Sequence, residues 1–179
     1  MLQNKSILIS GASGLIASCF IDVLMRKNQD GLNCKVYALG RNVEKAKNRF
    51  SPYWESNLFD FISHDINTPL EMDTDTVDYV IHMASDTHPV AYATDPIGTV
   101  TTNIIGTYNM LDFTVEHKAV LHSLHLTKYM GKTVAMLSSL TSITVVILTP
   151  TQCALDIQKA NAAVRHYARP IRSKRTSTS

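Results

Sequence analysis

Cysteines are few in this sequence, and long apolar segments are missing altogether. Cys19, Cys34 and Cys153 are scattered and share no metal-ligand spacing, which is typical of reduced thiols in the cytoplasm. No run reaches the eighteen apolar residues of a membrane span, and the first residues lack the pattern of a signal peptide. The sequence therefore predicts a cytoplasmic protein with no membrane partner.

An excess of charge is also missing from most of the chain. The formal net charge of +2 over 179 residues gives no electrostatic signature of nucleic-acid binding, so we expect no nucleic-acid partner. The basic residues from Arg165 to Arg175 are the exception, because no acidic residue accompanies them. Such a tail can bind nucleic acid or anionic lipid, but a solvated, disordered chain end is the more common case and the interpretation that we favour.

What is present is an alternation of strand-like and helix-like segments. Short apolar runs that suit buried parallel strands alternate with segments whose apolar residues recur at helical spacing. The expected strands are residues 6–10, 34–39, 58–63 and 77–83, and the expected helices are residues 18–26, 43–50 and 99–117. This order implies right-handed crossovers. We therefore predict an α/β fold, a Rossmann-type parallel sheet with helices on both faces.

A glycine turn lies between the first expected strand and the first expected helix. In Gly11-Ala-Ser-Gly14-Leu-Ile-Ala17, Gly11 permits a tight turn and Gly14 lets the backbone approach a pyrophosphate. The helix start then offers free N–H groups to the phosphates. The alternative is a turn that merely begins a helix, but its place directly after the first strand favours a dinucleotide site.

The second expected strand ends without an acidic residue. In dinucleotide-binding folds an acidic side chain at this point holds the 2′-hydroxyl of the adenosine ribose. Here the strand runs into Gly40, Arg41 and Asn42. Arg41 suits three roles, which the sequence leaves open: it accepts the 2′-phosphate of NADP, it stacks on adenine with NAD bound, or it is a surface arginine.

The character of the sequence changes after Lys118. Residues 120–126 mix histidines into an apolar run, and residues 133–150 carry no charge and have no clear period, although a strand is an option there. Residues 154–166 are weakly helical. We therefore expect a dinucleotide-binding domain at residues 1–118 and an atypical, irregular segment at residues 119–179, which leaves the sheet incomplete.

A second motif resembles a specific family. The fourth strand and following helix of the extended short-chain dehydrogenase/reductases are matched by His82-Met-Ala-Ser85, Pro89, Tyr92, Asp95-Pro96 and Thr102-Asn-Ile-Ile-Gly106-Thr107. The resemblance is to the NAD-dependent epimerase/dehydratase group, which includes UDP-glucuronate decarboxylases and dTDP-glucose dehydratases. With the glycine turn it covers about residues 6–118, and the two motifs at this separation are more specific than either alone.

The resemblance implies a role for each matching residue. The implied cofactor-binding residues are Gly11, Ser13, Gly14, Leu15 and Ile16 for the pyrophosphate, Asp65 and Ile66 for the adenine, Ala84 and Ser85 for the nicotinamide ribose, and Asn103 beneath the cofactor. Plainer roles also fit, with Asn103 as a polar core residue and Ser85 as a strand-end cap. For His82 we favour such a role, a packed histidine whose ring nitrogens are both bonded.

The resemblance also implies a chemistry. In the family, NAD takes a hydride from a carbon of a nucleotide-linked sugar and later returns it. A Tyr-x-x-x-Lys pair enables the proton transfer, with the tyrosine as general base and the lysine lowering its pKa. We therefore expect NAD as the cofactor, with NADP open, and a nucleotide sugar as the substrate of the family. A homodimer is one option for the assembly, because relatives commonly pair through two helices, the one after the fourth strand and the one that carries Tyr-x-x-x-Lys.

The chain contains no Tyr-x-x-x-Lys. Four residues after its tyrosines stand Arg41, Asn57, Met83, Pro96, Asp112, Thr133 and Ile171. Three functions fit this break: a fragment of a nucleotide-sugar epimerase, dehydratase or decarboxylase that is inactive as written, a dinucleotide-binding module without catalysis, or an unstable product with exposed apolar surface.

A shift of reading frame near residues 118–120 would explain the missing pair. When each new codon takes the third base of one codon and the first two of the next, residues 125–133 permit Ser-Asn-Glu-Val-Tyr-Gly-Lys-Asn. Residues 154–162 permit Ala-Arg-Tyr-Pro-Glu-Ser-Lys-Arg. These strings resemble the family's Ser-x-Glu-Val-Tyr-Gly segment and its Tyr-x-x-x-Lys helix. Most of these codons are permitted by degeneracy and not required by it, so the coding DNA decides.

Overall fold

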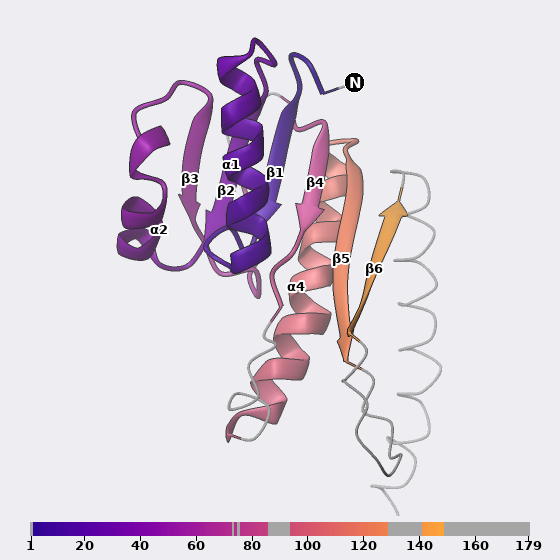
Figure 1. Cartoon of the computed structure of the whole chain (residues 1–179). Coiled ribbons are helices and arrows are strands. Elements are labelled where there is room, and N and C mark those ends of the chain that lie inside the picture. The colour runs from indigo at the N-terminus through magenta and orange to yellow at the C-terminus, as the bar shows by residue number, and fades with distance from the viewer. Residues whose placement is uncertain (1, 73, 75, 86–93, 129–140, 149–179) are drawn as a thin grey trace, which may run out of the picture.

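The computed structural model of the chain describes residues 2–72, 74, 76–85, 94–128 and 141–148 (Figure 1). The described strands form a sheet in the order β3-β2-β1-β4-β5-β6. They are β1 (Ser6–Ser10), β2 (Lys35–Gly40), β3 (Phe59–Ser63), β4 (Tyr79–His82), β5 (Val120–Lys128) and β6 (Thr141–Leu148). The first five strands are parallel, and β6 runs antiparallel to β5. The predicted parallel sheet is confirmed.

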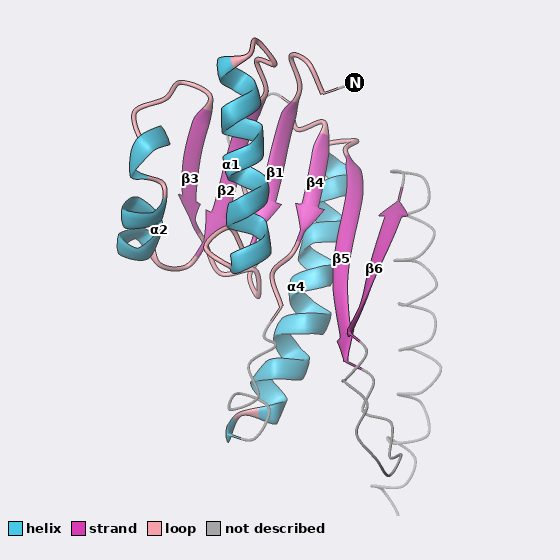
Figure 2. Cartoon of the chain, in the orientation of Figure 1, coloured by secondary structure: helices cyan, strands magenta, loops and turns pink. Residues whose placement is uncertain are grey.

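Helices cover both faces of this sheet, as predicted. On one face lie α1 (Leu15–Gln29), α2 (Val43–Arg49) and a short 3₁₀ turn, η1 (Ser51–Tyr53), and on the other lies α4 (Pro96–Glu116) (Figure 2). Side chains alternate along β1, so Ile7 and Ile9 join the core under α1 while Leu8 joins the core under α4. Every residue of β1 is buried, as expected for a central parallel strand whose middle is the apolar run Ile7-Leu8-Ile9.

Each face has its own core. Under α1 and α2, Ile21 packs with Phe50 and Phe59, whose ring centroids are 5.2 Å apart. Under α4, Met110 packs with Leu121 of β5. Buried side chains therefore hold α1 and α4 against the strands β3 and β5, and each typically costs about 2–5 kcal/mol to truncate to alanine.

Two helices begin earlier than their apolar spacing predicts. α1 starts at Leu15, directly after the glycine turn, and not at residue 18. α4 starts at Pro96 and not at residue 99. The Asp95 carboxylate accepts the N–H of Gly98 at 2.9 Å, and proline suits a first helical turn, where its missing N–H is not needed. Asp95-Pro96 is thus a helix start that apolar periodicity alone misses.

The sheet continues into the segment after residue 118. β5 pairs in parallel with β4, and β6 occupies part of the charge-free stretch for which a strand was an option. Other expectations lie outside the described residues: Pro89, Tyr92, Cys153, the helical pattern at 154–166 and the basic residues from 165 to 175. Among the helices that the structure describes, none has the length and apolar character of a membrane span.

Candidate functional site

Two glycines shape the turn after β1. Gly11 has a φ of +73°, a left-handed conformation that side chains disfavour, and a Cβ there would lie 2.8 Å from the backbone N and Cα of Ala84. Gly14 caps α1, and its N–H donates to the carbonyl of Gly11 at 2.8 Å. The turn therefore lies directly against the chain leaving β4, and a side chain at position 11 would separate the two.

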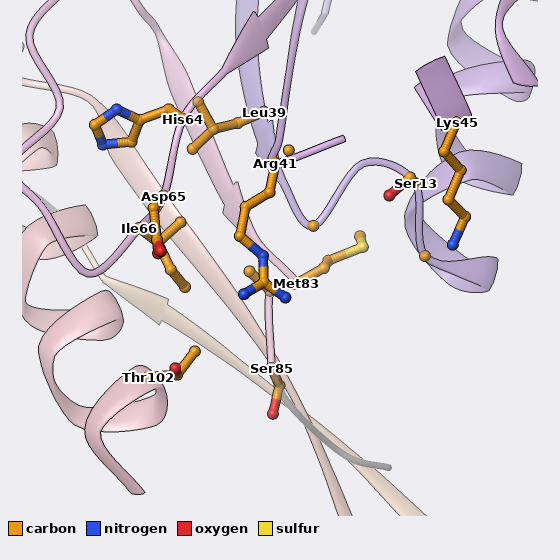
Figure 3. Close-up of a pocket in the computed structure, with 14 residues that line it drawn as sticks. Ser13, Leu39, Arg41, Lys45, His64, Asp65, Ile66, Met83, Ser85 and Thr102 are labelled. Carbon is orange, nitrogen blue, oxygen red and sulfur yellow. The ribbon is translucent and has the colours of Figure 1, made fainter. Parts of the chain in front are cut away.

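A cleft of about 320 Å³ opens at the carboxyl ends of β1 to β4 (Figure 3). This is the edge at which open α/β sheets bind their ligands. The predicted residues that line it are Gly11, Ser13, Gly14, Arg41, Asp65, Ile66, Ala84 and Ser85. The residues that line it but were not assigned to a site from the sequence are Leu39, Gly40, Lys45, His64, Met83 and Thr102.

Three predicted residues do not line the cleft. Leu15 and Ile16, in the first turn of α1, have 82% and 45% of their surface exposed, so a role in binding falls to their backbone N–H groups. Asn103 lies on α4, and its Oδ1 accepts the hydroxyl proton of Ser85 at 3.0 Å. Asn103 thus contacts a residue that lines the cleft, and the cofactor roles of these three residues stay predictions.

A buried hydrogen-bond network joins β1 to β4 beneath the turn. The hydroxyl oxygen of Ser10 accepts the backbone N–H groups of Met83 at 3.2 Å and Ala84 at 3.3 Å, which uses both of its lone pairs. The Ser10 proton therefore points to Nδ1 of His82, 2.7 Å away. These bonds fix the chain where it leaves β4, beside Gly11.

The second ring nitrogen of His82 extends the network to α4. Nε2 lies 3.2 Å from Oγ1 of Thr107, and Thr107 donates its own proton to the carbonyl of Asn103 at 2.6 Å. The geometry therefore assigns Nε2 as the donor to Thr107. Both ring nitrogens have partners, which confirms the predicted packed histidine. His82 supports the cleft without lining it.

A separate set of contacts holds the loop after β3. Asp65 accepts the backbone N–H of Asn67 at 3.0 Å, and the carbonyl of Ile66 accepts Nδ2 of Asn109 on α4 at 2.7 Å. Gly106 leaves room for this approach, since a Cβ there would lie 2.5 Å from Cδ1 of Ile66. Gly106 therefore has a packing role, in which it seats the loop that bounds one end of the cleft.

Two cationic side chains line the cleft without a partner among the described residues. Arg41 follows β2, and Lys45 lies in the first turn of α2 (Figure 3). Asp65 is the one carboxylate among the lining residues, so two cations against one anion leave a net charge of +1. Lys45 was missed in the sequence, although its four-residue spacing from Arg41 is a signal that could have found it.

The arrangement suits an extended anionic ligand. Free N–H groups at the head of α1 and two cations can bind phosphate, and Leu39, Ile66 and Met83 give the cleft an apolar wall. Within the described ranges, no cluster of three histidine, cysteine or acidic side chains could hold a metal ion.

The sequence matches a known family over most of its length. Residues 7–137 match the NAD dependent epimerase/dehydratase family. Similar proteins include UDP-glucuronic acid decarboxylase 5 of Arabidopsis thaliana, 33% identical over 109 residues, and UDP-glucuronic acid decarboxylase 1 of Danio rerio, 36% identical over 112 residues. Each alignment covers 61% of this chain but 30% and 24% of these relatives, so the match spans less than a third of their length.

Solved structures share the fold at low sequence identity. Pen from Bacillus thuringiensis has a TM-score of 0.55 at 19% identity, over 66% of this chain and 36% of that one. WbmF of Bordetella bronchiseptica in complex with NAD+ has a TM-score of 0.52 at 19% identity, over 65% and 34%. A double mutant of DesIV, a dTDP-glucose 4,6-dehydratase of Streptomyces venezuelae, with NAD and DAU bound, has a TM-score of 0.52 at 20% identity, over 63% and 36%.

Proposed function

Because the chain belongs to the NAD dependent epimerase/dehydratase family, we propose that residues 1–118 bind a nicotinamide dinucleotide at the carboxyl edge of the sheet. The pyrophosphate lies on the turn from Gly11 to Ile16, the adenine beside Asp65 and the nicotinamide ribose beside Ser85, with Asn103 behind it. One observation carries the proposal: the glycine turn, the loop after β3 and the end of β4 are far apart in the sequence but line one cleft.

In this proposal the chain's own residues hold and orient the cofactor. N–H groups at the head of α1 bind the diphosphate, and the Ser10–His82 hydrogen bond keeps the end of β4 in place beside it. When bound, the dinucleotide supplies acceptance and return of a hydride. Two similar proteins are UDP-glucuronic acid decarboxylases, so we propose nucleotide-linked sugars as the substrate class of the lineage.

We further propose that this chain binds without turning a substrate over. The family resemblance implies a Tyr-x-x-x-Lys base, and no tyrosine of the chain has a lysine four residues later. Hydride removal from an alcohol also requires removal of its proton, so a site without the base leaves the sugar unreacted. We expect a thermal shift with the dinucleotide and no turnover of UDP- or dTDP-sugars. Measurable turnover would contradict the proposal.

The missing pair also supports the proposal of a shifted reading frame. Both family strings are permitted in one shifted frame and in the right order, at residues 125–133 and 154–162. β5 pairs in parallel with β4 from Val120 onward. A strand in this position also fits the original reading frame, so the point at which the frame shifts is part of what the proposal must establish. Sequencing the coding DNA tests it. The proposal of a shifted frame would be contradicted if codons 156–161 cannot encode Tyr-Pro-Glu-Ser-Lys in that frame.

An apolar surface on α4 supports a homodimer. Side chains at helical spacing leave large parts of their surface exposed, namely Ile97 at 79%, Val100 at 56%, Ile104 at 65%, Ile105 at 42% and Tyr108 at 40%. Contiguous exposed apolar surface of this kind marks interaction sites. We propose that α4 packs against α4 of a second copy. Sedimentation velocity measures the mass, and a species of one chain at all concentrations would contradict it.

The described cysteines suit a reducing compartment. Cys19 and Cys34 are free. Burial, with a smaller contribution from Asp78, raises the pKa of Cys34 to about 11, so its thiol stays protonated and unreactive near neutral pH. Because both cysteines are free thiols and not disulfides, we propose a cytoplasmic location.

The variant Gly14→Val tests the placement of the pyrophosphate. Gly14 is exposed and has a φ of −73°, which any residue adopts, but a Cβ there would lie 3.1 Å from the carbonyl oxygen of Gly11, so valine should lower the stability slightly without unfolding the chain. Its side chain would meet the diphosphate. By isothermal titration calorimetry we expect no dinucleotide binding by Gly14→Val, with circular dichroism at the titration temperature showing that it is folded, and a smaller loss of affinity in the control Gly14→Ala, which has the same Cβ contact with Gly11. Full affinity in Gly14→Val would contradict the placement of the pyrophosphate on this turn.

A further inference from the structure

The end of β2 offers no acceptor for the free 2′-hydroxyl of an adenosine ribose. β2 ends at Gly40, which has no side chain, and Arg41 and Asn42 follow. The side-chain oxygen of Asn42 already accepts the backbone N–H of Lys45 at 2.8 Å. In folds that bind NAD, a carboxylate at this point holds the 2′-hydroxyl. None of these three residues supplies one.

Two cations lie near this point, Arg41 directly after β2 and Lys45 in the first turn of α2. Arg41 and Lys45 both line the cleft, and Figure 3 shows the Arg41 guanidinium reaching into it. Neither side chain has a hydrogen-bond or ion-pair partner within the described part of the chain. Lys35, on the same strand β2, pairs instead with Asp60 at 2.6 Å. The two cations of the cleft are therefore available to a ligand.

We infer that Arg41 and Lys45 bind the 2′-phosphate of NADP(H), so that the site selects NADP(H) over NAD(H). The inference rests on the proposed dinucleotide function. A phosphate monoester carries nearly two negative charges at pH 7, and its oxygens match the planar fork of an arginine and the ammonium of a lysine. Asp65, the carboxylate that lines the cleft, follows β3 and not β2. It is therefore not the β2-end carboxylate that holds the 2′-hydroxyl in folds that bind NAD.

The alternative role of Arg41 explains less. An arginine that stacks on adenine with NAD bound requires one cation. It gives no reason for a second, unpaired cation four residues later in the same cleft. A 2′-phosphate uses both side chains, and it also accounts for a β2 end without an acid.

Calorimetric titration of the full chain with NADP+ and with NAD+ tests the inference. We expect NADP+ to bind about ten- to a hundredfold more tightly, the range of one or two charged hydrogen bonds. Arg41→Ala should weaken NADP+ by about tenfold or more and NAD+ by less than about threefold, with Lys45→Ala showing the same pattern more weakly. Lys47→Ala, an exposed lysine of α2 that does not line the cleft, is the matched control and should change neither affinity.

Each failure has a separate meaning. If NAD+ binds as tightly as NADP+ or more tightly, the inference is overturned and the proposed function stands. If Arg41→Ala weakens both dinucleotides equally, Arg41 contacts the shared adenosine and the inference is also overturned. If neither dinucleotide binds the unmodified chain, the proposed function itself fails. Circular dichroism of the three variants confirms that exposed side chains were removed without loss of the fold.

Discussion

Charged side chains at the two ends of the parallel strands differ in whether they have hydrogen-bond partners within the described chain. At the amino ends, Asp78 accepts hydrogen bonds from Nζ of Lys5 at 2.7 Å and from the backbone N–H and hydroxyl of Ser6 at 2.8 and 3.1 Å. At the carboxyl ends, Arg41 and Lys45 line a cleft with no side-chain partner among the described residues. Groups that find partners within the chain support the fold, whereas charged groups left facing a cleft are available to a ligand.

The same contrast between bonded and unbonded side chains is found at the carboxyl end itself. Ser10 and His82 are buried and fully bonded beneath the turn, while Ser13 of the same turn lines the cleft. The residue type therefore does not decide the role. Two serines three positions apart serve the fold and the proposed ligand respectively, because one points into the sheet and the other into the cleft.

The largest effect is expected for Gly11→Ala, in the turn on which both roles depend. A positive φ costs a residue with a Cβ about 1–3 kcal/mol, and contact with the Ala84 backbone adds about 1–3 kcal/mol of overpacking. We expect urea unfolding to show a stability loss of about 2–6 kcal/mol and no dinucleotide binding. Gly31→Ala is the control, because Gly31 also has a positive φ, of +90°, but nothing within 4 Å of its Cβ position. An equal loss in both variants would contradict the packing role of Gly11.

A smaller effect is expected for Ser10→Ala, which breaks the buried network. Removal of the hydroxyl takes away its hydrogen bonds to Nδ1 of His82 and to two backbone N–H groups, and the loss of a partner at a buried group costs about 1–3 kcal/mol. Ser13→Ala removes a hydroxyl that has no partner among the described residues, so its stability should stay within about 0.5 kcal/mol. Thermal and urea unfolding compare the two. Similar losses for the two serines would end the distinction drawn between them.

The smallest effect is expected at the amino end, for Asp78→Asn. Partial burial raises the pKa of Asp78, but hydrogen bonds from Lys5 and Ser6 outweigh it and leave the pKa below its usual value. The stability that this carboxylate contributes is therefore present above its unfolded pKa, about 3.9, and lost as the pH falls through the lower folded value. The pair is partly exposed, with 43% and 28% of the two side chains accessible, so solvent screens it. Unfolding measured from pH 7 to pH 3 should show the two proteins converging in stability. A constant difference would contradict this assignment.

Much of the fold could be predicted from the order of apolar segments. β1 begins and ends where its apolar run does, and the other strands of the predicted sheet differ by a residue or two at their ends. β6 could be named only as an option and without bounds, because the stretch that contains it has no clear period. Its antiparallel direction depends on a partner, β5, and not on its own residues.

The site could be predicted where backbone geometry determines it. Gly11 could be predicted because glycine is needed there for its positive φ and for space, and Gly14 because a side chain there would crowd the carbonyl of Gly11. Lys45 was missed because the direction of a long, exposed side chain depends on how α2 packs. Leu15 and Ile16 show the converse, since a motif includes them for backbone N–H groups and the structure leaves their side chains exposed.

The order of the strands has a consequence for synthesis. β1 is made first but lies between β2 and β4, with Ser10 opposite Leu39 on one side and His82 on the other. One edge of this buried strand therefore stays unpaired until residues 79–82 have left the ribosome, and such open edges promote aggregation. The chain that follows residues 79–82 brings Ala84 against Gly11. Pairing of β4 therefore covers the free edge of β1 and completes the cleft at the same time.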